Sequence, residues 1–394
     1  MRTVASAAVR ILLFTGKGGV GKTTVAAATA QRAAASGLRT VVLSTDPAHS
    51  LADVFDAPLG DRPTPVGDRL DGQQLNARLR FEETWDDVRR YVVDVLDWAG
   101  ADAVEAEELA VVPGLDEVFA LADIKAFAAS GDYDLVVVDC APTAETIRLL
   151  SLPDVLSWYM DRVFDAQRRL TRLTRPVMSR LTSMPMAGDG VFGAIRRFYD
   201  RLDGVRELLT DGVTTSARLV VNPERLVVAE ARRTFTYLSL FGYHVDAVIA
   251  NRLLPDTVAD PWFAKWKEAQ SAHLAVIRDA FAPLPVLAAE LAEHEIVGVE
   301  RLADLGVSLY GDLDPAARLC ELQPMRVDAV GDALVLSLHL PFTARDDVRL
   351  GRSEAELLLT VGPHRRAFLL PDSLQRREVA GARLEGDRLE VEFV

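Results

Sequence analysis

The chain has little cysteine, little lysine and no long apolar run. Its two cysteines, Cys140 and Cys320, in 394 residues exclude a disulfide scaffold and a metal site built from four cysteines of one chain. No apolar run reaches the roughly 18 residues that a membrane-spanning helix needs. The formal net charge is −14, and this acidic balance argues against a nucleic-acid partner, which would require a clustered basic surface.

The N-terminus has one feature of a signal peptide and two features of a buried strand. Arg2 precedes the apolar stretch Val4–Phe14, which resembles a cleavable leader. However, Arg10 interrupts that stretch, and the stretch runs directly into a glycine-rich loop at Gly16. Cleavage there would remove the strand that presents the loop. We therefore expect a buried first strand over Arg10–Phe14 and a soluble, cytoplasmic protein.

A phosphate-binding loop follows this strand. Residues 15–24 read Thr-Gly-Lys-Gly-Gly-Val-Gly-Lys-Thr-Thr and fit the pattern G-x-x-x-x-G-K-S/T, and the helix-forming run Val25–Ala35 comes next. Glycines let successive backbone N–H groups turn toward phosphate oxygens, and the helix N-terminus adds partial positive charge. In the predicted nucleotide site, Lys22 bridges the β- and γ-phosphates and the Thr23 hydroxyl coordinates Mg²⁺. The residues assigned to the nucleotide are Gly16, Gly18, Gly19, Val20, Gly21, Lys22, Thr23 and Thr24.

The loop holds two lysines in a chain that is short of them. Lys17 and Lys22 both stand within residues 16–23, and only three other lysines occur among the 44 basic residues. Since Arg serves almost everywhere else, a compact and rotatable ammonium group is indicated here. A solvated loop lysine is the alternative for Lys17. The functional interpretation is a second catalytic cation, which reaches a partner's nucleotide across a dimer interface and neutralises charge in the transition state.

With Lys17 in place, the loop resembles the deviant Walker A of the signal-recognition, MinD and nitrogenase-iron-protein class of ATPases. Within that class, the chain is similar to the arsenite-pump ATPase ArsA and to the guided-entry ATPase that targets tail-anchored membrane proteins. The resemblance covers roughly residues 9–312. It implies ATP hydrolysis with Mg²⁺ on a parallel-sheet P-loop fold.

Two further segments extend the resemblance at the ends of predicted strands. The segment Asp46–Leu51 follows the strand Thr40–Ser44 and resembles switch I of the family. There the leading aspartate orients the attacking water, a catalytic and metal-site role that falls on Asp46; taken alone, Asp-Pro is also an ordinary start of a turn. The β-branched run Tyr133–Val138 ends at Asp139, which matches the Walker B aspartate that reaches Mg²⁺.

The segment after this aspartate departs from the family's switch II, which usually reads Asp-Thr-Ala-Pro-Thr-Gly-His. This chain has Cys140, Ala144 and Glu145 at the positions of the first Thr, the Gly and the His. Alanine in place of glycine removes backbone freedom, so we expect the coupling of hydrolysis to movement to differ from that of the eukaryotic targeting factor. Cys140 is interpreted as a small core residue rather than a redox centre.

Two later segments are assigned to the adenine by the same resemblance. The run Val248–Leu254 is similar to a family segment whose Asn hydrogen-bonds the adenine. That role falls on Asn251, because an amide offers both a donor and an acceptor. Pro285, in the run Pro283–Val286, stands near the position where the family closes the adenine pocket.

Several features of the named relatives are missing from this chain. It has one phosphate loop where the tandem arsenite-pump subunit has two, so we expect a homodimer that brings two loops face to face. Activation by arsenite needs clustered thiolates, whereas Cys140 and Cys320 are far apart in the sequence. The Cys-x-x-Cys that holds zinc in the eukaryotic targeting factor is also missing. We therefore expect neither metalloid chemistry nor a zinc-clasped dimer.

Residues 155–209 are helical by pattern and are expected to form a helical insertion in the ATPase domain. Methionine and aromatic residues alternate there: Met160, Met178, Met184, Met186, Trp158, Tyr159, Phe164 and Phe192. Flexible Met side chains recur at surfaces that accept varied apolar partners. In the targeting family this region builds a hydrophobic groove. The interpretation is a groove for an apolar helix of a client protein, and an ordinary helical core is the alternative.

From about Pro324 the hydrophobic spacing changes to a period of two. Short runs separated by turn signals predict strands at 334–340, Glu356–Val361, Arg366–Leu370, Val379–Leu384 and Leu389–Val394. The pattern predicts a small β-sandwich that resembles the α-crystallin domain of small heat-shock proteins, which a plastid and bacterial branch of the ATPase family appends. The Ile-x-Ile tail of that domain is missing, so we do not expect its usual route to oligomers.

Together these observations predict an α/β fold: a parallel-sheet P-loop NTPase core with a helical insertion, over residues 1–314, and an all-β sandwich over residues 324–394. The expected cofactors are ATP and Mg²⁺. The expected partners are a second copy and a hydrophobic helical client, without nucleic acid or stable membrane insertion. The expected function is ATP hydrolysis coupled to client binding and release.

Two other functions stay open at this point. One is a positioning ATPase of the MinD or ParA type, which needs a basic surface or a C-terminal amphipathic helix; this acidic chain ends in a predicted strand. The other is a metalloid-pump ATPase subunit, which the cysteine placement disfavours.

Overall fold

The computed structural model describes residues 9–46, 50–75, 115–141, 193, 196, 200–353 and 356–394. Some sequence predictions concern other residues. The switch I residues from Pro47 to His49, the switch II positions of Ala144 and Glu145, and the helical insertion up to residue 199, apart from 193 and 196, lie outside the described residues. The groove interpretation of that insertion therefore stays a prediction.

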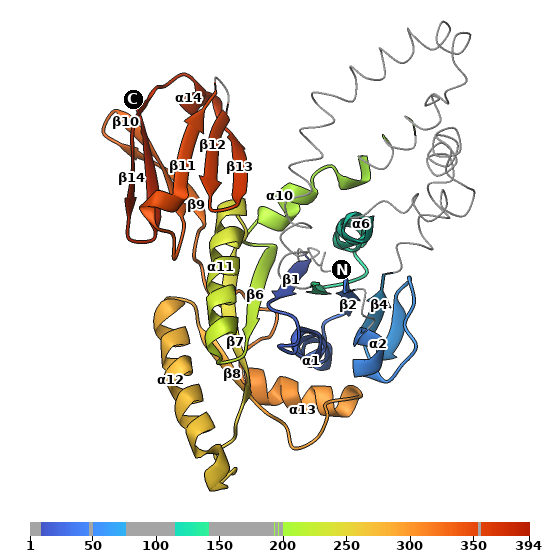
Figure 1. The fold of residues 1–394 in the computed structure, drawn as a ribbon. Helices are drawn as coiled ribbons and strands as arrows, with labels where there is room; N and C mark the ends of the chain where they lie inside the picture. The colour runs from blue at the N-terminus through green and yellow to red at the C-terminus, as the bar shows by residue number, and fades with distance from the viewer. Residues whose placement is uncertain are drawn as a thin grey trace, which may run out of the picture.

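An eight-stranded sheet forms the centre of the larger part of the molecule (Figure 1), with the order β3-β4-β2-β5-β1-β6-β7-β8. All neighbouring pairs are parallel except β3 with β4. Strands β1, β2, β5 and β6 are buried along their length, which explains their continuous apolar runs and confirms the predicted parallel sheet. The strands are β1 Arg10–Thr15, β2 Thr40–Ser44, β3 Thr64–Gly67, β4 Leu70–Gln74, β5 Leu135–Asp139, β6 Thr215–Val221, β7 Val245–Leu253 and β8 Val286–Glu290.

Helices cover both faces of this sheet. Helices α1 and α13 lie on one face, and α6 and α10 lie on the other (Figure 1). A Cβ on Gly306 would lie 2.8 Å from the Ala28 carbonyl oxygen, so glycine permits the close packing of α13 on α1. Among the described helices, none is long and apolar enough to cross a membrane. The helices are α1 Lys22–Ala35, α2 Ser50–Phe55, α6 Leu115–Ser130, α10 Val205–Thr210, α11 Arg225–Phe241, α12 Ala264–Ala280 and α13 Val299–Tyr310.

The C-terminal part is a β-sandwich, as predicted. Its four-stranded sheet has the order β14-β15-β10-β9, and its three-stranded sheet has the order β11-β12-β13. Buried residues of both sheets, such as Leu336, Leu359, Phe368 and Val391, form one apolar cluster between them. The strands are β9 Met325–Val330, β10 Ala333–His339, β11 Val348–Arg352, β12 Glu356–Val361, β13 His364–Leu369, β14 Val379–Glu385 and β15 Arg388–Phe393, with the short α14 Asp372–Gln375 before β14.

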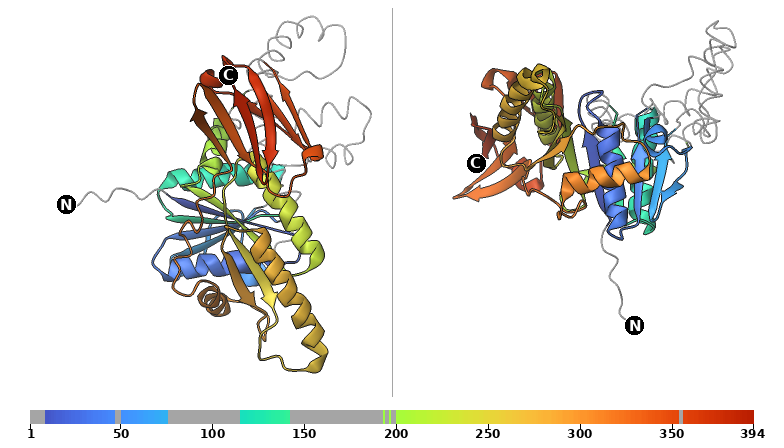
Figure 2. Two further views of the ribbon diagram at one scale, coloured as in Figure 1. Left: turned by 90° about the vertical axis from the view of Figure 1, so that its left-hand side faces the viewer. Right: turned by 90° about the horizontal axis from the view of Figure 1, so that it is seen from below.

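Helix α11 joins the sandwich to the eight-stranded sheet (Figure 2). Leu240 of this helix is fully buried in the apolar cluster of the sandwich. The Arg366 guanidinium of β13 donates a hydrogen bond to the Leu240 carbonyl oxygen, where the helix C-terminus carries partial negative charge. The ring of Tyr237 lies 4.0 Å from the ring of His364 between centroids. The two parts of the molecule thus share one helix.

A buried ionic network fastens the segment between the two parts. The Arg218 guanidinium of β6 is fully buried and pairs with Asp246 of β7 at 3.0 Å. It also donates hydrogen bonds to the Pro315 and Ala317 carbonyl oxygens at 2.8 and 2.9 Å. Arg10 of β1 donates to the Ala316 carbonyl oxygen at 3.1 Å. The segment 315–317 is therefore hydrogen-bonded to two strands, β1 and β6. The predicted domain limits at 314 and 324 stay predictions.

Candidate functional site

The phosphate loop lies between the C-terminal end of β1 and the N-terminus of α1, where ligands bind in open parallel sheets. Gly21 precedes α1 in a left-handed conformation, with φ 91°, and provides no side-chain cap. The first N–H groups of α1 are therefore left for an anion. A Cβ on Gly16 would lie 2.3 Å from the Val220 carbonyl oxygen, so the loop depends on glycine for its path across β6. These contacts fit the predicted phosphate cradle of residues 16–24.

The two loop lysines differ in their surroundings. Lys22 is buried, and its ammonium nitrogen lies 3.3 Å from the Lys17 carbonyl oxygen, to which it donates a hydrogen bond. This bond holds the Lys22 side chain over its own loop. The Lys17 side chain is half-buried, and within the described residues its ammonium group has no hydrogen-bond or ion-pair partner. Its predicted role toward a partner's nucleotide stays a prediction.

Asp139 ends β5 as a fully buried carboxylate. It accepts a hydrogen bond from the Ser44 hydroxyl at 3.0 Å, and the nearby Thr23 hydroxyl lowers its pKa. Burial nevertheless raises the pKa of Asp139 to about 6, because desolvation outweighs these hydroxyl groups and the nearby Lys22 charge. The other carboxylate oxygen, Oδ1, is buried without a hydrogen-bond partner among the described residues. Such an orphaned acceptor indicates a ligand.

The residues present fit a Mg²⁺ ion. The Thr23 hydroxyl and the carboxylates of Asp46 and Asp139 are the hard oxygen ligands that Mg²⁺ prefers. The Thr23 hydroxyl lowers the pKa of Asp139 and the charge of Asp46 raises it, so both groups lie close to this carboxylate. When bound, the ion would neutralise charge on the β- and γ-phosphate oxygens. The buried Asp139 Oδ1 would then receive the partner that it lacks.

Ser44 is a site residue that the sequence reasoning missed. It ends β2, and the parallel register places it directly opposite Asp139 of the neighbouring β5. The next residue, Thr45, accepts a hydrogen bond from the Ala141 backbone N–H at 3.0 Å. These contacts connect the beginnings of the segments that resemble switch I and switch II. The sequence signal that could have identified Ser44 is a polar residue that ends a buried strand, just as the Walker B aspartate ends the neighbouring strand.

The two cysteines do not form a thiolate site. Cys140 is fully buried, and burial raises the pKa of its thiol to about 12. Cys320 is partly exposed in the segment before β9, and both thiols are free. No group of three or more His, Cys, Asp or Glu side chains within the described residues has the geometry of a metal site. The interpretation of Cys140 as a small core residue agrees with this burial.

Asn251 supports the phosphate loop from the end of β7. Its side-chain amide donates to the Val20 carbonyl oxygen at 2.8 Å, and its Oδ1 accepts from the Arg252 backbone N–H at 2.9 Å. A Cβ on Gly21 would lie 2.4 Å from the Asn251 amide nitrogen. Asn251 thus fixes the loop conformation, a role that the sequence did not reveal. The adenine contact predicted for it stays a prediction.

A cavity of about 260 Å³ opens beside the loop and Asn251. Gly21 and Thr24 line it on one side. Glu290 at the end of β8 and the segment that follows this strand, including Ile296, line it on the other. Pro285 lies at the opposite end of β8, where its carbonyl oxygen accepts a hydrogen bond from the Val248 backbone N–H at 3.0 Å. The structure therefore does not bring Pro285 to this cavity. Pro285 precedes β8, the cavity lies at the far end of this strand, and the five residues of β8 separate the two.

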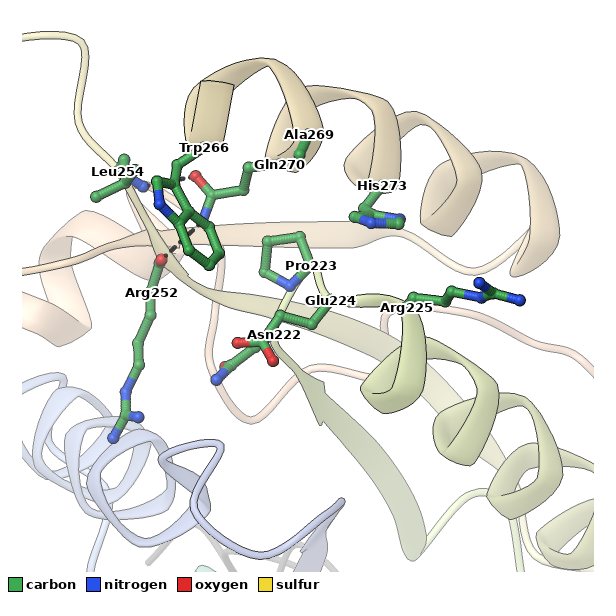
Figure 3. A pocket seen from close by; sticks show the side chains of 10 residues that line it. All are labelled: Asn222, Pro223, Glu224, Arg225, Arg252, Leu254, Trp266, Ala269, Gln270 and His273. Carbon is green, nitrogen blue, oxygen red and sulfur yellow. Dashed lines mark hydrogen bonds between the residues drawn. The ribbon is translucent and has the colours of Figure 1, made fainter. Parts of the chain in front are cut away.

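A second cavity, of about 320 Å³, lies between the end of β6 and α12 (Figure 3). Gln270 of α12 accepts a hydrogen bond from the Leu254 backbone N–H at 2.8 Å and donates to the Arg252 carbonyl oxygen at 3.0 Å. Arg252 lines both cavities and has a left-handed backbone, with φ 61°. The Arg252 backbone N–H donates to Asn251, and its carbonyl oxygen accepts from Gln270, so hydrogen bonds hold this strained backbone in place. Strained residues of this kind are typical of functional sites.

Comparison with known proteins decides the family. The family described as "Anion-transporting ATPase" matches residues 9–311. The chain belongs to the ArsA ATPase family. A second family, the "HSP20-like domain found in ArsA", matches residues 331–393, which is the observed sandwich. The match confirms the predicted resemblance and the ATPase activity, and ATP binding follows from membership of the ArsA family.

Relatives of this ArsA-family chain include proteins named as arsenical pump-driving ATPases and one named as a GET3-type ATPase. A "Putative arsenical pump-driving ATPase 1" of Aquifex aeolicus is 35% identical over 390 residues, which cover 96% of this chain and 98% of that protein. A "Putative arsenical pump-driving ATPase" of Chlorobaculum tepidum is 38% identical over 387 residues, covering 98% and 96%. The "ATPase GET3B" of Arabidopsis thaliana is 32% identical over 316 residues, covering 74% and 76%.

Proposed function

We propose that this ATPase works as a Mg²⁺-dependent homodimer that binds and releases a hydrophobic protein client in step with ATP hydrolysis. The observation that carries the catalytic part is the pair of lysines. Lys22 is held over its own loop, whereas the ammonium group of Lys17 has no partner in the described residues. In a chain with one phosphate loop, a second copy provides the nucleotide that Lys17 would reach.

Within this proposal each residue has a distinct task. Lys22 neutralises the phosphates in its own subunit, and Lys17 neutralises those of the partner as negative charge develops in the transition state. Thr23 and Asp139 hold the metal ion. Asp46, whose backbone N–H contacts the Ser44 hydroxyl at 3.3 Å, accepts a hydrogen bond from the attacking water and orients it.

Mixing two inactive variants tests the action across subunits. Lys17→Ala and Lys22→Ala are each expected to reduce ATP turnover to near the background rate. In a mixed dimer, the Lys17→Ala subunit keeps its own Lys22 and receives Lys17 from the Lys22→Ala subunit. Random pairing then restores about a quarter of the wild-type sites. A mixture as inactive as its components, with both variants still dimeric, contradicts the proposal.

The client part is supported by sequence and by relatives rather than by contacts. One relative is named for a GET3-type ATPase, the sandwich matches an HSP20-like domain, and the Met-rich stretch within 155–209 suits apolar partners. The arsenical names of other relatives are not matched by this chain's cysteines, because two distant thiols, one of them buried, do not make a soft-metalloid site.

A binding experiment separates these functions. The chain with ATP and Mg²⁺ is expected to keep a peptide of about 20 apolar residues in solution, and the triple variant Met160→Gln, Met178→Gln and Met184→Gln is expected to lose this effect while it keeps basal ATP turnover. Normal client holding by the triple variant overturns the groove assignment. Stimulation of turnover by arsenite favours the pump function instead.

A further inference from the structure

Strand β9 is an open edge of the sandwich. It forms one margin of the four-stranded sheet (Figures 1 and 2), and in the described part of the chain it pairs only with β10. Its apolar side chains are unusually exposed, at 42% for Met325, 46% for Val327 and 61% for Val330. An exposed apolar edge is a template for pairing with another strand.

The hydrogen-bond pattern fixes which backbone groups face outward. The His339 N–H donates to the Pro324 carbonyl oxygen at 2.8 Å, so these two residues are a hydrogen-bonded pair of the antiparallel ladder. Hydrogen-bonded and non-hydrogen-bonded pairs alternate along such a ladder. The backbone groups of Arg326 and Asp328 therefore face β10. Those of Met325, Val327 and Ala329 face away from the sheet.

The side chains of β9 divide by face in the same way. Met325, Val327 and Ala329 stand opposite Leu338, Leu336 and Leu334 of β10, so they share the face that packs against the three-stranded sheet. Leu336 and Leu338 are buried under the three-stranded sheet, whereas Met325 and Val327 continue the same apolar face into the solvent-exposed edge. On the other face, the Arg326 guanidinium pairs with the Asp328 carboxylate at 2.8 Å.

The strand is complementary to itself in one register. When a second β9 runs antiparallel with Val327 opposite Val327, the outward-facing residues Met325, Val327 and Ala329 of both copies form the hydrogen-bonded pairs. Arg326 of each copy then faces Asp328 of the other in a close, non-hydrogen-bonded pair. A slip of the two-fold axis by one residue places Arg326 opposite Arg326 or Asp328 opposite Asp328. Like charges directly opposite each other disfavour both slipped registers.

We propose that β9 is a docking strand for β9 of a second copy of this chain, with the two-fold axis at Val327. The pairing continues the four-stranded sheet of one copy into that of the other. Val327 of each copy is then covered by Val327 of the other, Met325 of each copy lies opposite Ala329 of the other, and the two charge pairs set the register. The occupant is a second copy because the outward backbone groups of β9 match those of another β9, and the charges of both copies are complementary in this register.

This contact is separate from the proposed dimer of phosphate loops. It lies on the sandwich, uses no nucleotide ligand and forms without ATP or Mg²⁺. All tests therefore use the full chain with EDTA and without nucleotide, so that a failure of β9 pairing and a failure of the nucleotide-dependent dimer are observed under different conditions.

Cysteine cross-linking tests the register. In a Cys320→Ser background, Val327→Cys places two thiols in a pair whose Cα atoms are about 5.5 Å apart, within the range of a disulfide. The matched control is Val330→Cys, an exposed residue of the same strand whose two copies would be about 20 Å apart. Mild oxidation is expected to give a covalent dimer with Val327→Cys only. Equal dimer yields from both variants, or none from Val327→Cys, overturn the proposal.

Charge reversal tests the complementarity without cysteine. Arg326→Asp and Asp328→Arg each place like charges opposite each other in both pairs, so each variant alone is expected to sediment with a lower dimer fraction than wild type. An equimolar mixture restores opposite charges in the heterodimer, and its dimer fraction is expected to return toward the wild-type value. A variant that merely misfolded would gain nothing from mixing. Single variants that associate like wild type, or a mixture without recovery, contradict the register.

Discussion

At the scale of single residues, the main energetic cost in the site is the desolvation of the Asp139 carboxylate. A buried carboxylate is stable only when hydrogen bonds and cations replace its hydration. The Ser44 hydroxyl donates to one carboxylate oxygen, and Oδ1 is left without a hydrogen-bond partner in the described residues. The protein thus maintains an incompletely satisfied charge at the position where a metal ion is expected.

We expect Asp139→Asn to abolish Mg²⁺-dependent ATP turnover and to stabilise the nucleotide-free protein. The folded-state pKa of Asp139, about 6, lies above its ordinary value of 3.8. Wild type therefore loses stability as the pH rises from about 4 to about 6, by up to about 3 kcal/mol. The amide has no charge to desolvate, so the variant lacks this loss. Urea unfolding at several pH values between 4 and 8, without nucleotide, measures the difference.

The matched control is Asp134→Asn, just before the same strand. Asp134 forms a partly exposed ion pair with Arg39, which holds the pKa of this carboxyl below its ordinary value. This variant is expected to be slightly less stable than wild type above pH 4, the opposite sign. If Asp139→Asn is also less stable than wild type at pH 8, the charge of Asp139 is compensated within the protein.

Residue identities were readable from the sequence where chemistry dictates them. Lys22 and Asp139 were assigned from the requirements of phosphate and Mg²⁺, and the structure places Lys22 at the start of α1 and Asp139 at the end of β5. Their roles stay predictions. The contact of Asn251 with the Val20 carbonyl oxygen was not readable, because it joins residues that are far apart in the sequence. Pro285 was assigned to the adenine by resemblance alone, and it lies at the other end of β8 from the cavity beside the loop. Its contact with the adenine stays a prediction.

At the scale of elements, buried charge holds the strands to the connecting segment. Arg218 of β6 pairs with Asp246 of β7 and donates to two carbonyl oxygens of residues 315–317. Both side chains are almost completely buried. Removing one partner of such a pair leaves the other charge uncompensated, which costs more than the pair contributes.

We expect Arg218→Met to lower the free energy of unfolding by roughly 3–5 kcal/mol, because two buried carbonyl oxygens lose their donor and Asp246 keeps only the longer contacts with Arg10 and the Leu319 N–H, both at 3.4 Å. Arg39→Met removes an exposed ion pair instead and serves as the control, with little change expected. Denaturant unfolding of the full chain measures both. Equal effects of the two substitutions would show that the network does not fasten the segment.

Elements were predicted from the sequence when their pattern was strong. The buried runs of β1, β2 and β5 and the alternating run of β10 were assigned close to their observed limits. Strand β9 was not predicted, because all but one of its residues are exposed and its pattern reflects an edge rather than a core. Strand β11 was missed for a similar reason, since Gly351 and two arginines interrupt its apolar residues.

At the scale of the whole molecule, α11 contributes residues to both apolar cores. Val228 and Phe235 belong to the core of the eight-stranded sheet, and Leu240 belongs to the core of the sandwich. The Thr236 hydroxyl donates to the Pro341 carbonyl oxygen across the boundary. Because a single helix contributes to both cores, unfolding of one core exposes a face of the other.

We expect Leu359→Ala, a cavity in the sandwich core, to destabilise the ATPase part as well. Leu359 is fully buried, and such truncations cost about 2–5 kcal/mol. Thermal inactivation of ATP turnover reports on the ATPase part, and circular dichroism reports on the whole chain. Both midpoints are expected to fall by the same amount. A lower unfolding midpoint without a change in inactivation would show that the two parts unfold independently.

The position of Leu240 also decides how this protein is divided for protein engineering. A cut at the connecting segment near residue 320 would separate the sandwich from a helix that fills part of its interior, and would leave that helix with an apolar face in water. A graft of the sandwich onto another enzyme has to include the end of α11 with Thr236 and Leu240, because these residues complete the contacts and the core of the sandwich. The transferable module therefore begins inside a helix of the catalytic part, about 85 residues before the first strand of the sandwich.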